Sequence, residues 1–240
     1  MTTLTKIIVS TILSLLTFSC NFDFNFGVNG NGNVTTTNRD LNGSFDKIST
    51  SRGLNVILAQ GERESVSVEA DENLQDIIVV EIKGSTLQIT TTENIASSAS
   101  KTVYVTFDDL VKIETSSGSD VISEGTIETE NLTLETSSGS DLELTLKANN
   151  IECGTSSGSE LTLKGTANSI TASASSGSEI SASSLETQSA NLRATSGADI
   201  SVNTKKELSA KANSGGSISY TGNPEMVKKD VATSGSVYSN

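Results

Sequence analysis

The sequence predicts an all-β fold, a parallel β-helix built from coils of about 20 residues. The first observation behind this prediction is a Ser-Ser-Gly-Ser motif, or a close variant, that recurs through the second half of the chain. Its glycines are Gly118, Gly139, Gly158, Gly177, Gly197, Gly215 and Gly235. A fixed period near 20 residues is typical of a solenoid, in which each repeat buries its apolar side only against its neighbours.

The second observation is the alternation of apolar and polar residues between these glycines. Counted from each glycine, positions at odd offsets are apolar or small, and those at even offsets carry charges and hydroxyls. The column three residues after the glycine shows this best: Val121, Leu142, Leu161, Ile180, Ile200 and Ile218. A period of two indicates strands with one face inward, whereas a helix would need a spacing of 3.6 residues.

One continuous folded domain is expected over residues 41–240, in two parts. Residues 111–240 carry the regular repeats. Residues 41–110 contain short β-branched segments such as Leu54–Leu58 and Val103–Phe107 outside the repeat register. Because the terminal repeats of a solenoid are atypical, we interpret residues 41–110 as N-terminal coils and an irregular, strand-rich cap.

The composition excludes several classes of function. The formal net charge is −13 and no basic stripe exists, which argues against nucleic acid and against adsorption onto anionic lipid. The chain has no His, so a Ser-His-Asp triad and His-based metal sites are excluded. We therefore expect no catalytic residues and no cofactor.

The N-terminus has the pattern of an export signal over residues 1–19. Lys6 precedes the apolar run from Ile7 to Leu16, which is too short to span a membrane. Ser19 directly before Cys20 is typical of a bacterial lipoprotein site, and we favour lipid attachment at Cys20 over an ordinary cleaved signal. Residues 20–40 are then the lipidated Cys and a flexible Asn-, Gly- and Thr-rich tether. This interpretation places the protein in the cell envelope, anchored in the outer membrane.

Cys153 has no intramolecular partner if Cys20 carries lipid, so no disulfide framework is expected. It stands in an inward column where neighbouring repeats have Leu134 and Ala172. We interpret it as a small buried hydrophobe.

Acidic residues give two candidate sites. An acid stands two places after the glycine in five consecutive repeats: Asp120, Asp141, Glu160, Glu179 and Asp199. This column is interpreted as a solvated face, with weak Ca²⁺ binding as the alternative. A second group, Glu62, Glu64, Asp71 and Glu72 in the cap, is where a carbohydrate-cleaving site would need converging acids.

The many Ser and Thr residues also have two interpretations. They suit tight turns and hydrogen-bonded ladders, or they present hydroxyls to a glycan. At the C-terminus an unfinished coil would expose strand edges. The segment 221–229 could cover that edge, or the edge could be an interface between copies of the chain. We favour the cover.

The order of these elements resembles a known family. Phe45–Ile48, Leu54–Gly61, Val66–Val68, Gly84–Ile89 and Val103–Val105, followed by the Ser-Gly-Ser ladder, are similar to the auto-transporter adhesin head (GIN) domain, common in envelope lipoproteins of Bacteroidetes-type bacteria. The resemblance covers about residues 45–225. It implies a right-handed β-helix and an adhesin-like role, and it carries no established catalytic residues.

The sequence therefore predicts a non-catalytic, lipid-anchored envelope protein with an adhesin-like, scaffold or binding role. The expected partners are the membrane, through the anchor, and an envelope protein or glycan, with self-association through the C-terminal coil. The alternative is a β-helix protein that binds or cleaves polysaccharide.

Overall fold

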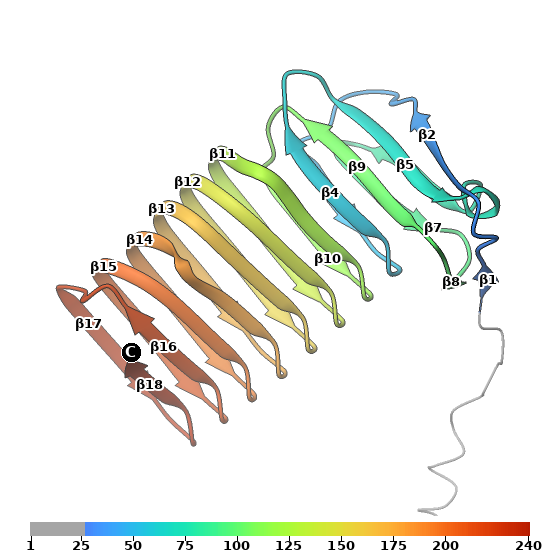
Figure 1. The fold of residues 1–240 in the computed structure, drawn as a ribbon. Helices are drawn as coiled ribbons and strands as arrows, with labels where there is room; N and C mark the ends of the chain where they lie inside the picture. The colour runs from blue at the N-terminus through green and yellow to red at the C-terminus, as the bar shows by residue number, and fades with distance from the viewer. Residues whose placement is uncertain (1–26) are drawn as a thin grey trace, which may run out of the picture.

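The computed structural model describes residues 27–240, which form one long β-solenoid with an elaborated N-terminal end (Figure 1). Cys20, the predicted export signal and the start of the predicted tether lie outside these residues. The part of the chain that the structure describes contains no helix long and apolar enough to cross a membrane.

Five long strands make the regular rungs of the solenoid. Each runs along one face, bends, and returns along the other face. They are β11 (Asp120–Ser137), β12 (Asp141–Ser156), β13 (Glu160–Ala174), β14 (Glu179–Thr195) and β15 (Asp199–Asn213). Each pairs in parallel with the next, and the repeat is about 19 residues. The predicted parallel β-helix is confirmed.

The inward columns meet as the sequence predicts. Leu142, Leu161 and Ile180 are directly paired in register on β12, β13 and β14, and each is at most 1% exposed. Cys153 is also buried, between Leu134 and Ala172. The core is a narrow layer between two sheet faces, which explains how a chain with only 34% hydrophobic residues can fill it.

The N-terminal end is wound in a different spatial order from its sequence. The first rung is β3 (Lys47–Thr50) and β4 (Asn55–Gln60). The chain then turns back to build the cap from β5 (Ser65–Asp71), the 3₁₀ turn η1 (Glu72–Leu74), β6 (Ile78–Lys83), β7 (Thr86–Thr91), β8 (Ile95–Ser97) and β9 (Lys101–Phe107).

As a result, the first rung lies between two segments that follow it in sequence. β7 and β9 pair with one side of β3 and β4, whereas β10 (Lys112–Ser116) and β11 pair with the other side. Figure 1 shows β4 between β9 and β11. The sequence indicated an irregular cap here but not this reversal, because each strand has the same alternating pattern whichever neighbour it pairs with.

The predicted tether does not extend through residues 28–39. β1 (Val28–Asn29) pairs with β8, and β2 (Val34–Arg39) pairs antiparallel with β5. β2 is mostly polar, since it reads Val-Thr-Thr-Thr-Asn-Arg, and its partner β5 supplies the buried residues. The Asn-, Gly- and Thr-rich composition of this segment suggested a linker, although Thr also favours strands.

The C-terminal end also differs from the prediction. The last rung consists of β17 (Met226–Val231) and β18 (Ser236–Ser239), which stack on β15 and on β16 (Ser217–Thr221). β17 pairs with β15 as a regular rung strand, so the segment 221–229 does not fold over the edge as a cover. The register also aligns Ser217 with Ser236, which places Ser234, rather than Gly235, at the position of the motif glycine.

Candidate functional site

The recurring Ser-Gly pair forms a tight turn between the two faces of the solenoid. Ser117 and Gly118 both have positive φ, 57° and 69°, and Ser119 N–H lies 3.4 Å from Ser116 O. Two successive left-handed residues define a type I′ turn, which explains why glycine holds the second place. Arg52 and Gly53 form an equivalent turn in the first rung, one that the sequence analysis missed because its motif reads Ser-Arg-Gly-Leu.

The hydroxyls beside these turns are mostly used inside the protein. The serine after the glycine is buried in four successive rungs. Ser140 Oγ donates to the backbone oxygens of Thr115 and Ser137, at 3.0 and 2.9 Å. Thr155 Oγ1 and Ser178 Oγ are 2.8 Å apart and link neighbouring rungs. These contacts support the ladder interpretation for the buried hydroxyls over presentation to a glycan.

The five acids of the predicted column do lie next to one another. The ladder pairs Asp120 with Asp141, then Glu160, Glu179 and Asp199, and all five are exposed. Desolvation, and next the negative charge of Asp141, raise the pKa of Asp120 above its usual value. No group of three or more acids, Cys or His within residues 27–240 has a geometry that could hold a metal ion. The column is an exposed acidic face.

The four acids of the cap do not converge. Glu62 and Glu64 precede β5, whereas Asp71 ends that strand and Glu72 follows it. Six residue steps along a strand span roughly 20 Å, far more than the 5–9.5 Å that paired catalytic carboxylates need. Three of the four also accept hydrogen bonds: Glu64 from Phe45 N–H, Glu72 from the Asn33 side chain, and Asp71 from backbone N–H groups described next.

Asp71 has a structural environment of its own. Its carboxylate accepts hydrogen bonds from the backbone N–H groups of Gly32, Ala99 and Ser100, at 2.8, 2.9 and 3.0 Å. The bond from Ser100, followed by that from Gly32, lowers the pKa of Asp71. Asp71 also stands at the N-cap position of η1, but its side chain makes no cap bond to that turn. It ties the segment before β2 to the segment between β8 and β9.

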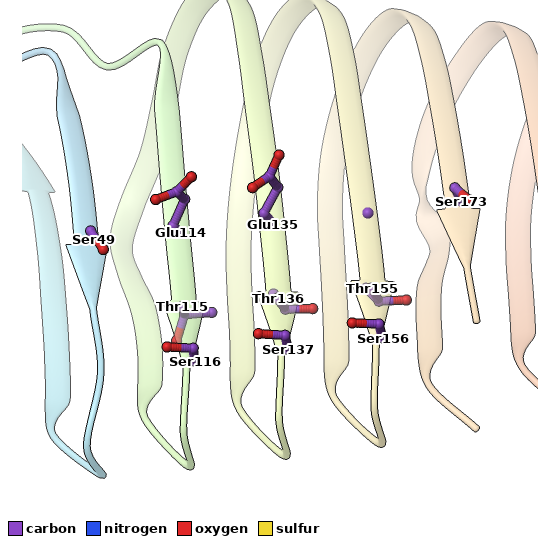
Figure 2. A pocket seen from close by; sticks show the side chains of 11 residues that line it. Ser49, Glu114, Thr115, Ser116, Glu135, Thr136, Ser137, Thr155, Ser156 and Ser173 are labelled. Carbon is purple, nitrogen blue, oxygen red and sulfur yellow. The ribbon is translucent and has the colours of Figure 1, made fainter. Parts of the chain in front are cut away.

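A shallow hollow of about 430 Å³ lies on the outer face just before the turns (Figure 2). Glu114 and Glu135 lie side by side on adjacent rungs, and the next rung has Gly154, which leaves the hollow. Lys112 Nζ pairs with both carboxylates, 2.5 Å from Glu114 and 3.3 Å from Glu135. The hollow is polar and open, and its charges are already partnered.

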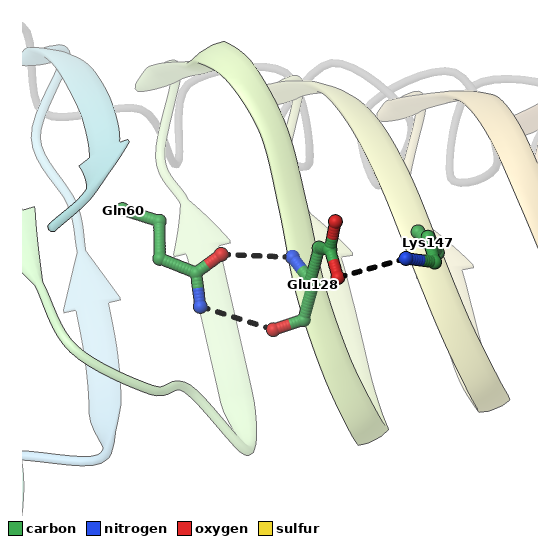
Figure 3. A network of polar contacts seen from close by, with 3 residues as sticks. All are labelled: Gln60, Glu128 and Lys147. Carbon is green, nitrogen blue, oxygen red and sulfur yellow. Dashed lines mark hydrogen bonds and ion pairs between the residues drawn. The ribbon is translucent and has the colours of Figure 1, made fainter.

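A second hollow, of about 860 Å³, lies at the opposite bend of the coils. Here the Gln60 side chain acts as a piece of strand backbone (Figure 3): Glu128 N–H donates to Gln60 Oε1 at 2.8 Å, and Gln60 Nε2 donates to Glu128 O at 3.0 Å. Lys147 then pairs with the Glu128 carboxylate at 2.9 Å. Gln60 thus continues the first rung beyond the end of β4, and sequence reasoning did not find it because no motif marks it.

Cys153 behaves as its column predicts. Burial, with a smaller contribution from Glu152, raises the pKa of its thiol to about 12. Its Sγ lies 3.7 Å from Thr171 O. A thiol held neutral in this way is not a nucleophile at physiological pH.

One apolar group is exposed on the outer face near the cap. Tyr104 on β9 and Ile122 on β11 flank Ile57 of β4 in register, and they are 38% and 46% exposed. Outward positions of the regular rungs are otherwise polar, as with Glu143, which follows Ile122 in the ladder. We call Tyr104, Ile57 and Ile122 the outer apolar patch.

Comparison with solved structures gives several chains of the same fold. A putative adhesin from Bacteroides fragilis has a TM-score of 0.82 and 19% identity, covering 89% of this chain and 100% of its own. A putative lipid binding protein from Parabacteroides distasonis has a TM-score of 0.73 and 22% identity, over 89% and 99%. A putative adhesin from Parabacteroides merdae has a TM-score of 0.71 and 18% identity, over 89% and 98%.

No curated protein matches the sequence. The family described as "Putative auto-transporter adhesin, head GIN domain" matches residues 44–224, about three quarters of the chain and nearly the range that the order of motifs indicated. The chain belongs to this family of adhesin head (GIN) domains.

Proposed function

We propose that this protein is a non-catalytic, lipid-anchored component of the cell envelope that displays its solenoid as an adhesin-like rod. Membership of an adhesin head family supports an adhesin-like role at the envelope or cell surface. The export signal and the Cys20 motif support the lipid anchor.

The observation that carries the non-catalytic part is the separation of the cap acids. Glu64 and Asp71 stand at opposite ends of β5, and both accept backbone hydrogen bonds that the fold needs. The five acids of the column line up in a single row along the ladder. These features favour a surface that binds over one that performs chemistry.

The anchor and the rod together suggest an orientation. Cys20 is seven residues from Gly27, at most about 25 Å of extended chain. The described chain begins at the capped end, and β17 and β18 lie at the other end of the stack (Figure 1). About seven turns at a spacing of ~4.8 Å hold that far end roughly 30 Å from the cap. The faces of the solenoid, rather than its capped end, are then presented to a partner.

The test uses intact cells that express the wild-type chain or Cys20→Ala. We expect incorporation of a labelled fatty acid that Cys20→Ala abolishes, digestion by protease added outside the cells, and adhesion to a coated surface that is lost in the variant. Survival of the chain in intact cells, with digestion only after the membrane is opened, would remove display and adhesion from the proposal. Fatty-acid labelling that persists in Cys20→Ala would remove the anchor.

Glycan binding is the second candidate, and the outer apolar patch favours it. An exposed Tyr beside two Ile side chains offers an apolar surface to a sugar ring, and exposed apolar patches commonly mark binding sites. Tyr104→Ala should abolish retention on a polysaccharide column, whereas Tyr238→Ala, which removes another exposed Tyr, should not. Equal retention of both variants and the wild type would contradict this candidate.

A further inference from the structure

The C-terminal end of the solenoid is its least protected part. Within the described chain, β17 pairs only with β15 and β18 only with β16, so each has a free edge. Eight large hydrophobic residues of the described chain are exposed, and four belong to this last rung: Met226, Val227, Val231 and Tyr238. Free strand edges beside exposed apolar side chains are the usual route to pairing with another chain.

One inward column changes character at this end. Along the stack it reads Ile48, Ile113, Leu134, Cys153, Ala172, Leu192, Ala210 and finally Lys229. The seven preceding members are buried and apolar. Lys229 is thus a charged residue at a position that every earlier rung reserves for the core.

The Lys229 side chain reaches across the open end of the last coil. Its Nζ lies 4.9 Å from the centre of the Tyr220 ring and donates to Val237 O at 3.2 Å. Tyr220 and Val237 belong to β16 and β18, on the opposite face from β17. The ammonium group therefore sits between the two faces, where a further rung would place apolar side chains.

Without Lys229, the edge of β17 would match a second copy of itself. When two β17 strands pair antiparallel about residue 229, Val227 faces Val231 of the other copy and Lys228 faces Asp230. Residues directly opposite each other in an antiparallel pair point to the same face of the sheet, and residues 227, 229 and 231 share one face of β17. The inward side chains of both copies therefore stay on the inward face. At the twofold axis Lys229 lies against its own copy.

The charge distribution near this end also fits a second copy. The acidic column ends at Asp199, and the next two positions of that ladder are Ser217 and Ser236. Residues 216–240 contain two Lys, Glu225 and Asp230, a net charge of zero, although the whole chain carries −13. Two such ends would meet without the repulsion that other parts of the surface would generate.

We propose that Lys229 keeps the C-terminal end of the solenoid closed against end-to-end pairing with a second copy of this chain. The end is a latent strand-pairing surface for its own copy. A single inward charge, held over Tyr220 and by Val237 O, prevents that pairing, because dimerisation would bury two ammonium groups against each other.

The test compares Lys229 with its neighbour Lys228, which has the same charge on the same strand but points outward. The full chain in mild detergent is examined by sedimentation velocity over a range of concentrations. The wild type and Lys228→Val should sediment as monomers, and Lys229→Val should form dimers. Lys229→Ala, which copies Ala210 of the preceding rung, serves as a second variant if Val disturbs folding. Circular dichroism checks that each variant is folded.

A cysteine at the twofold axis tests the geometry. Under a mild oxidant Lys229→Cys should give a disulfide-linked dimer on a non-reducing gel, whereas Lys228→Cys, which faces Asp230 of the other copy, should not. A dimeric wild type, a monomeric Lys229→Val together with a monomeric Lys229→Ala, or equal association of the Lys228 and Lys229 variants would each overturn the proposal.

Discussion

Replacing Gly165 by Ala tests how closely the rungs of the solenoid are packed. Gly165 on β13 pairs with Leu146 of the preceding rung and has φ of 108°. A Cβ there would lie 2.0 Å from Leu146 O, a backbone atom that cannot rotate away. A left-handed backbone costs a non-glycine residue about 1–2 kcal/mol, and overpacking adds about 1–3 kcal/mol. The variant should lose about 2–5 kcal/mol of its unfolding free energy, a large part of the 5–15 kcal/mol typical of a folded protein.

Gly154→Ala is the matched control for this prediction. Gly154 lies outside the left-handed region, nothing is within 4 Å of its added Cβ, and its ladder neighbours are Glu135 and Ser173. Removing a glycine from the unfolded chain should stabilise this variant by about 0.4–1 kcal/mol. Urea unfolding followed by far-UV circular dichroism measures both. Unfolding free energies for the two variants that agree within about 1 kcal/mol would refute the steric argument, since both changes add the same methyl group.

Three further predictions concern single side chains. Because backbone N–H groups, that of Ser100 first, lower the pKa of Asp71, its contribution to stability is complete above the unfolded pKa near ~3.9 and is lost as the pH falls through the folded value. Asp71→Asn should therefore lower the urea midpoint most at pH 7 and by less as the pH falls further below ~3.9, and a loss that does not change with pH would contradict this. Thr155→Val breaks the bond to Ser178 and should cost about 1 kcal/mol of unfolding free energy. Thr50→Val, which removes a buried hydroxyl without a partner, should be neutral or stabilising. Urea unfolding measures both, and a Thr50→Val variant less stable than Thr155→Val would contradict this. Cys153 should resist alkylation at pH 8 until urea unfolds the chain, as followed by mass spectrometry, and rapid labelling of the folded protein would show that the thiol is accessible.

The regular part of the fold could be predicted because every rung repeats the same pattern of inward and outward residues. Leu142, Leu161 and Ile180 occupy one inward column by counting alone, and the ladder pairs them. The cap strands do not follow this repeat, so their order could not be predicted by counting. Nothing in the sequence of β4 or β9 reveals that β9 enters between β4 and β5, since parallel and antiparallel neighbours accept the same alternation of side chains.

The candidate sites that follow from the repeat could also be predicted, and those outside it could not. The acidic column followed from the repeat and is present as predicted, and the buried Cys153 followed from its column. The cap acids were grouped because Glu64 and Asp71 are near in sequence, but a strand separates its ends by its full length. Gln60 and Lys229 were not singled out because the contacts of each depend on its place at the end of a rung or of the stack.

A stack of nearly identical rungs has no intrinsic reason to stop at one molecule, since each new rung would offer the same edge as the last. Three features of this chain oppose its association with itself. At the N-terminal end the chain winds back, and β2, β5 and η1 cover the first rungs. Along the side, five stacked carboxylates would repel a second rod placed against the same face. At the C-terminal end, a single ammonium group takes the place of a core residue. If the rod functions by displaying its faces at the cell surface, these features keep those faces free for a partner of different chemistry, and Lys229 is the one whose removal should be visible as a change in oligomeric state.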